Sequence, residues 1–485
     1  MDLKNIPPEI LGLILGQLAV LQDETCVDQY GEVMLTDLRN ARLVCRQWNA
    51  LASEHLFRAI PLLHNPQDET FASWNAAVDS EMVQKLARVA EIYSGPHHGR
   101  YTDMWKDRGF QVWNSWEAGE WKEFQQAISR LADLPNLHEV YICFYEMCEG
   151  FEHGQDPDHW PSGQEKVEVR STRLHTLRHV FRAMRQHKAR YGTIRTLSIE
   201  NWANHPLPEL ILSDDFQSFV KDITTLRLRV AEETNEDVED WEYELNYIER
   251  QTFEPFLQNQ FLPLFADQLT SLHLGFNQCW GTAPGTFDGS GLHFPNLKHL
   301  HLFQFAIAHD DHFDWVLRQT SLERLHLNQC GIASRLYLED EKIQRWGVKT
   351  HDWRSNPPLS TEDWHEKPHA YDGTWAAVFD KIRTSLGQLV DFQIATCEDL
   401  CNPFVTPDPA PMYPDPNSCY AIGYRYLWFD GGMNIPWCNE GDRQLILDED
   451  SDLEDRVQER EKGDINAWEE LMQVIRERRA RKIMR

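Results

Sequence analysis

The stretches Leu269–Leu274 (LTSLHL), Leu297–Leu302 (LKHLHL) and Leu322–Leu327 (LERLHL) repeat one pattern, apolar-x-x-apolar-x-apolar. This pattern is typical of a short strand with a buried face. Most of its occurrences along the chain follow a helical pattern, as Phe313, Val316 and Leu317 precede the third of these stretches. Helices that alternate with strands predict an α/β fold in which the strands are parallel and stacked.

The pattern occurs seven times, and the gaps between starts are 57, 29, 46, 28, 25 and 67 residues. Three gaps match the ~20–29 residues of one leucine-rich repeat, and the other three require insertions or an undetected repeat. The region resembles an irregular α/β leucine-rich repeat, and an unrelated α/β domain with leucine-rich strands is the alternative. In both cases each unit buries its apolar face against its neighbours, which predicts a curved solenoid with a long concave surface. The first positions are Leu137, Ile194, Ile223, Leu269, Leu297, Leu322 and Leu389.

Three of the occurrences carry a small polar residue three places after the last apolar one. These are Asn277, Cys330 and Cys397. In leucine-rich repeats this position can hydrogen-bond the backbone of the turn. The resemblance therefore implies a structural ladder role for these three side chains.

The first sixty residues predict two or three short helices. Pro7 and Pro8 suit a helix start, and Glu9 in the first turn suits the helix dipole. A second start at Thr36 is followed by one apolar face that includes Leu38, Ala41, Val44, Cys45, Trp48 and Leu51. The first helix is expected to bury a stripe of Ile6, Ile10, Leu13, Ile14 and Leu18. A module of about 50 residues is marginal alone, so some of its apolar surface should meet a partner or the next domain.

The same residues, with the run from Arg42 to Trp48 (RLVCRQW), resemble an F-box, and Leu56-Phe57-Arg58 resembles its fungal version. That resemblance implies docking on a Skp-type adaptor, and through it on a cullin, in an SCF (Skp–cullin–F-box) ubiquitin ligase. The connection from Ala19 to Thr36 is longer than is usual in the family. The matching adaptor-facing candidates are Ile6, Pro7, Ile10, Leu15, Leu38, Val44, Cys45 and Trp48.

The overall charge narrows the classes of partner. The 485 residues include 47 Lys and Arg and 77 Asp and Glu, so the net charge is 47 − 77 = −30. A strongly negative protein repels phosphate, which argues against nucleic-acid binding and favours protein partners. The apolar run Ile10–Leu21 is shorter than the about 20 residues of a membrane-spanning helix. The ten cysteines form no disulfide framework, so we expect a cytoplasmic or nuclear protein without membrane contact.

The sequence predicts three parts: an F-box at 1–60, a leucine-rich-repeat-like solenoid at 61–440, and an acidic linker with a basic amphipathic helix at 441–485. Insertions are expected at 231–255 and 335–371, and a strand pair around Tyr426 and Trp428 is expected to cap the solenoid. The stretch 231–244 holds eight acids and no basic residue, which indicates a solvated loop or a site for a basic substrate segment. The basic end from Arg476 suits a helix dipole or nuclear localisation.

The sequence contains only weak matches to catalytic and metal-binding motifs. His365–His369 (HEKPH) matches the zinc-protease string H-E-x-x-H, but Pro368 disrupts the helix which that chemistry needs. The spacing of Cys397, Cys401, Cys419 and Cys438 is loose for a zinc site. We therefore expect no catalytic residues, no metal and no cofactor, and a non-enzymatic receptor for an unidentified protein substrate. The alternatives are an interaction scaffold outside any ligase and, more remotely, a hydrolase in the C-terminal half.

Overall fold

The computed structural model gives the positions of most of the chain. The residues it describes are 7–25, 36–63, 71–94, 119–145, 148, 168, 170–192, 194–233, 248–338, 340–355, 367–395, 426–430, 437–439 and 451–484.

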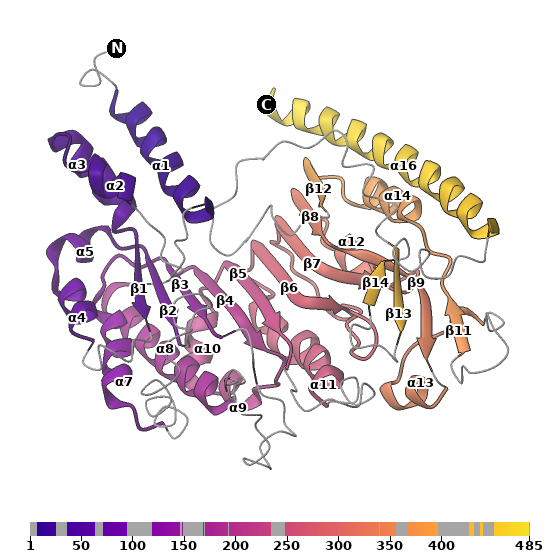
Figure 1. Ribbon diagram of the computed structural model, residues 1–485, viewed down its shortest axis with the longest axis horizontal. Coiled ribbons are helices and arrows are strands. Elements are labelled where there is room, and N and C mark those ends of the chain that lie inside the picture. Colours follow the sequence, from indigo (N-terminus) through magenta and orange to yellow (C-terminus); the bar gives the residue numbers. More distant parts are fainter. Residues whose placement is uncertain are drawn as a thin grey trace.

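Nine parallel strands, in sequence order, form the main sheet of the described chain. All seven predicted strands are among them, which confirms the predicted parallel α/β region. Figure 1 shows the strands side by side, from the N-terminal end of the chain to the C-terminal end. The strands are β1 (Ala59–Leu63), β2 (Val89–Tyr93), β3 (Glu139–Cys143), β4 (Thr196–Ala203), β5 (Thr225–Ala231), β6 (Ser271–Trp280), β7 (His299–Ile307), β8 (Arg324–Asn328) and β12 (Asp391–Ala395).

Helices between the strands cover one face of this sheet. In Figure 1, α7, α8, α10 and α11 lie along the same side of the strands. The helices of this region are α4 (Ala72–Asp79), α5 (Glu81–Leu86), α7 (Lys122–Ser129), α8 (Arg170–Tyr191), α9 (Pro208–Ile211), α10 (Asp214–Val220), α11 (Ile248–Phe256), α12 (Asp314–Leu317) and α14 (Trp375–Ser385). The helix α11 begins within the predicted insertion 231–255 and ends just beyond it, at Phe256. Because Phe253 and Phe256 are buried in the main core, that end of the stretch belongs to the α/β region.

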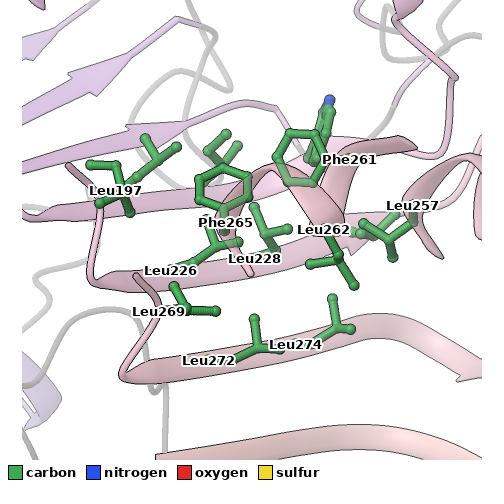
Figure 2. Packing of buried hydrophobic residues seen from close by; sticks show 14 of the residues in the cluster. Leu197, Leu226, Leu228, Leu257, Phe261, Leu262, Phe265, Leu269, Leu272 and Leu274 are labelled. Carbon is green, nitrogen blue, oxygen red and sulfur yellow. The ribbon is translucent and has the colours of Figure 1, made fainter. Parts of the chain in front are cut away.

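The core is built from the second and third apolar positions of the repeated pattern. Leu226 and Leu228 of β5 are in register with Leu272 and Leu274 of β6, and all four are buried. Figure 2 shows these leucines beside Phe261 and Phe265, which belong to the helical turns that follow α11. Each strand therefore buries one face against a helical segment, and the strands between β1 and β12 hydrogen-bond to a neighbour at both edges.

The first two strands were not predicted. Phe57, Ile60 and Leu62 fit the repeated pattern at β1, and Ala87, Ala90 and Ile92 fit it at β2. Pro61 lies within β1. Pro61 is tolerated there because β1 is an edge strand, where a missing N–H costs no ladder bond. The strands β1 and β2 thus form the start of the sheet, and β1 begins inside the predicted F-box segment.

A second, smaller sheet branches from the end of β7. Its strands are β9 (Gly331–Leu338), β10 (Arg354–Ser355), β11 (Lys367–Ala370), β13 (Tyr426–Asp430) and β14 (Trp437–Asn439). The predicted insertion 335–371 therefore begins within β9 and contributes β10, β11 and α13 (Asp340–Trp346) to an ordered sheet with its own buried cluster. The predicted strand pair around Tyr426 is confirmed, because β13 pairs antiparallel with β14.

The C-terminal helix α16 (Ser451–Ile483) packs along α14 at the far end of the array (Figure 1). It starts within the acidic stretch that was expected to be a linker. Asp464 accepts hydrogen bonds from the Ala376 N–H (2.7 Å) at the start of α14 and from the Tyr426 hydroxyl (2.6 Å). Arg478 donates to the carbonyls of Leu386 (2.7 Å) and Arg383 (2.9 Å) at the end of α14. Arg478 of the tail thus supplies donors to carbonyls at the C-terminal end of α14, where a helix runs out of its own N–H groups.

We predict that Asp464→Ala loosens α16. The change removes a buried acceptor from the Ala376 N–H and the Tyr426 hydroxyl, which costs about 1–3 kcal/mol for groups left unsatisfied. Limited proteolysis should cut within 451–484 faster than in the parent protein. Glu469→Ala, at an exposed position of the same helix, is the control and should leave the rate unchanged. Equal cleavage of both variants would show that α16 does not depend on this contact.

Candidate functional site

The N-terminal module consists of α1 (Pro8–Thr25), α2 (Thr36–Ala41) and α3 (Arg46–Leu56). Its small core is separate from that of the sheet. Leu11 and Leu15 of α1 pack with Leu38 of α2 and Ala52 of α3, each at most 1% exposed. Trp48, Leu51 and Leu56 are partly buried against these side chains.

Three residues of the stripe predicted to be buried on α1 point outward instead, whereas Ile6 and the Leu18 side chain lie outside the described part. Ile10, Leu13 and Ile14 are 50%, 67% and 43% exposed, because Leu11 and Leu15 face the core. On the turn between α2 and α3, Leu43 and Val44 are 84% and 56% exposed. Large exposed apolar side chains on one small module indicate an interaction surface. We call these five residues the apolar surface of the module.

The adaptor candidates divide between surface and core. Pro7, Ile10 and Val44 are exposed, and Cys45 and Trp48 are half-buried. Leu15 and Leu38 are fully buried, so their side chains stabilise the module and are not accessible in this structure. Ile6 lies outside the described residues.

The apolar face predicted from Thr36 to Leu51 is interrupted by a turn. Residues 42–44 leave the helix, and Cys45 is extended (φ −164°, ψ 174°) before α3 begins. Val44 and Cys45 are weak helix formers, which favours the break. Arg42 stabilises the turn, because its Nε donates to Asn49 Oδ1 (3.1 Å) and its guanidinium lies 5.1 Å from the centre of the Phe57 ring. The break places Leu43 and Val44 at the surface.

The module joins the sheet through two residues. Phe57 follows α3 and packs against the main core, and the Arg58 carbonyl accepts from the N–H groups of Arg88 (2.7 Å) and Val89 (3.0 Å) at the start of β2. Only Phe57 and Arg58 separate α3 from β1. This short, hydrogen-bonded junction holds the module at the end of the sheet (Figure 1).

The comparison with known families agrees with this geometry. Residues 3–60 match the F-box-like family. The N-terminal module is an F-box-like domain. Its presence implies binding to a Skp-type adaptor. The match covers the three helices and ends inside β1.

No curated protein matches the chain. Within the described ranges, no helix is both long and apolar enough to span a membrane.

The face of the main sheet opposite the helices carries ion pairs and a row of histidines, together with a small apolar cluster of Tyr141 and Cys143. We call it the polar sheet face. Arg227 Nη1 lies 2.8 Å from Glu139 Oε1, and the Ser198 hydroxyl donates to the same oxygen (3.0 Å). One cross-strand row in register continues from Arg227 through His273, His301 and His326, with ring centres 5.4 and 5.8 Å apart. Burial lowers the pKa of His301 to about 3, so this imidazole is neutral at physiological pH.

Two acids of the predicted acidic stretch are not solvated. Glu233 is 4% exposed and forms ion pairs with the Arg250 guanidinium of α11, which also lies 3.4 Å from Glu232. The Asn204 amide donates to the same Glu233 carboxylate. Since a buried carboxylate needs such partners, Glu232 and Glu233 connect β5 to α11. The other six acids lie outside the described residues.

The three predicted ladder residues differ in their contacts. The Cys330 thiol donates to the carbonyl of Leu302 (3.4 Å) on the neighbouring β7. Asn277 instead accepts a hydrogen bond from Arg229 Nε (2.8 Å), because Arg229 extends across from the adjacent strand β5. Cys397 lies outside the described residues.

The second histidine of the H-E-x-x-H string, His369, lies in β11, so it is not on a helix.

We predict that a buried and an exposed leucine of the F-box-like domain differ in how much they contribute to its stability. Leu38→Ala removes a side chain that is 0% exposed and should cost about 2–5 kcal/mol of local stability. Leu43→Ala, at a position 84% exposed, should change it by no more than about 0.5 kcal/mol. Hydrogen exchange of the amides in α2 and α3 measures this difference. Equal exchange in both variants would contradict the assigned core.

Proposed function

We propose that this protein is the substrate-recognition subunit of an SCF-type ubiquitin ligase. The F-box-like domain binds a Skp-type adaptor, and through it a cullin, while the α/β region binds a protein target. The apolar surface of the module carries the proposal, since Ile10, Leu13, Ile14, Leu43 and Val44 remain exposed beside a fully formed core. A protein partner that covers these side chains removes them from water.

The α/β region supports a receptor role. Its strands follow one another in sequence order, as in a leucine-rich-repeat solenoid, and the polar sheet face presents polar side chains from Glu139 on β3 to His326 on β8. We infer that the region is of the leucine-rich-repeat type and that the polar sheet face contacts the target. The Cys330 contact with the neighbouring strand is consistent with such a ladder.

The proposed mechanism is proximity, and this chain performs no chemistry itself. Ubiquitin transfer belongs to other subunits, and the receptor raises the local concentration of target lysines near the charged carrier. This requires a defined geometry between the two binding parts. The junction at Phe57 and Arg58 supports it, because packing and backbone hydrogen bonds leave little freedom between α3 and β1.

The decisive experiment is a binding assay with a purified Skp-type adaptor. Ile10→Asp and Val44→Asp place a charge on the apolar surface without touching the module core, and each should weaken binding by about 2 kcal/mol, or ~30-fold. These variants are cleaner than Trp48→Ala, because Trp48 is partly buried and its loss also disturbs folding.

Leu212→Asp is the matched control. Leu212 is 77% exposed but lies in the α/β region, so the variant should bind like the parent protein. The proposal fails if the parent protein does not bind the adaptor, or if all three variants bind equally. Co-purification of a cullin then separates a ligase receptor from a scaffold, since a scaffold would retain the adaptor alone.

A further inference from the structure

Two histidines and an aspartate from distant parts of the sequence meet beside the second sheet. His309 follows the end of β7, whereas His351 and Asp352 lie in the turn between α13 and β10. His309 Nδ1 is 2.6 Å from Asp352 Oδ1, and His351 Nε2 is 3.9 Å from Asp352 Oδ2. Within the described ranges, no other three His, Cys, Asp or Glu residues bring one ligand atom each within 4.8 Å of one another.

Two members of this cluster, His309 and Asp352, are held in place by their surroundings. His309 is only 7% exposed, and its ring is parallel to that of Trp353, with centres 5.5 Å apart. Trp353 Nε1 donates to the Ala308 carbonyl (2.6 Å), and the Asp310 N–H donates to Asp352 Oδ2 (2.9 Å). Two segments about forty residues apart are thereby fixed against each other. A preorganised donor set of this kind lowers the cost of binding a ligand.

The charges near the cluster favour a cation. Asp310 and Asp311 directly follow His309 in sequence and add two carboxylates to that of Asp352. The Asp310 carboxylate accepts a hydrogen bond from the Tyr371 hydroxyl (3.1 Å), which is a neutral donor. Lys381 contributes a positive charge, donating to the Asp310 carbonyl.

We propose that His309, His351 and Asp352 bind a divalent cation of the zinc class. Bonds of about 2.0–2.1 Å in a tetrahedral site imply ligand atoms about 3.3 Å apart. The separations of 2.6 and 3.9 Å, measured to the two different oxygens of the Asp352 carboxylate, lie on either side of this value. One ligand atom from each of the three residues lies within 4.8 Å of the other two, so a cation can draw them together by small side-chain movements. Two imidazoles and one carboxylate, with water as the fourth ligand, form a known zinc ligand set.

Binding requires two local adjustments. The cation replaces the proton between His309 Nδ1 and Asp352, so the neutral imidazole carries its proton on Nε2. The His351 ring is stacked on His309, 5.0 Å away at an interplanar angle of 11°, and must rotate to direct a lone pair at the cation. Its side chain is 57% exposed, which leaves room for that rotation.

The cation would link the turn before β10 to the segment that follows β7, because its ligands come from both. It would therefore stabilise the contact between the second sheet and the main sheet. This site is distinct from the H-E-x-x-H string, because it uses neither His365 nor His369. The inference is also independent of adaptor binding.

Metal binding to the full-length chain, stripped with a chelator, tests the proposal. We expect titration calorimetry with Zn²⁺ to show one equivalent that is lost in His351→Ala, while Asp352→Asn binds at least ~10-fold more weakly, because even outer-shell partners are worth ~10–100-fold. Co²⁺ should give the visible absorption of a tetrahedral site without a thiolate charge-transfer band. That spectrum excludes binding at the cysteines.

His293→Ala is the matched control, because His293 is an exposed histidine outside the cluster. It should bind Zn²⁺ and Co²⁺ like the parent protein. Circular dichroism of each variant verifies that its fold is retained. The proposal is overturned if the parent protein binds no equivalent of Zn²⁺, or if His351→Ala and Asp352→Asn bind as well as His293→Ala.

Discussion

Hydrogen bonding between successive parallel strands is the constraint on which the rest of the molecule depends. A parallel strand requires a neighbour at each edge and a helix against its apolar face, so no unit of this region is stable alone. The two ends of the main sheet therefore need cover. At one end, the F-box-like domain directly precedes β1 in the chain. At the other end, α16 packs beside β12 and α14.

The start of the strand ladder also fixes the position of the F-box-like domain relative to the sheet. Phe57 is partly buried against the core of the sheet, and the Arg42 side chain of the module lies over its ring. The Arg58 carbonyl begins the ladder to β2. The domain can thus expose an apolar surface at Ile10 and Val44 while its position relative to the α/β region stays defined. A receptor that works by proximity needs both properties.

Much of the fold was predictable from the sequence, because leucines at fixed spacing identify strands buried on one face. The strands β1 and β2 were missed since Pro61 and the small Ala87 and Ala90 weaken that pattern. The second sheet was missed because β9 pairs with β13, about ninety residues away. At the candidate site, the motif identified the module, but spacing alone did not show that Leu11 and Leu15 face inward. The cluster of His309, His351 and Asp352 has no sequence signal, because only the tertiary fold brings its members together.

The central claim is that the F-box-like domain docks its adaptor through the apolar surface while the α/β region remains free for a target. Hydrogen–deuterium exchange of the full-length chain, with and without a purified Skp-type adaptor, tests it most directly. The account predicts new protection in the first turns of α1 and in residues 42–48, with exchange in β3 to β8 unchanged. Protection confined to the strands of the main sheet, or none in the three helices, would contradict it.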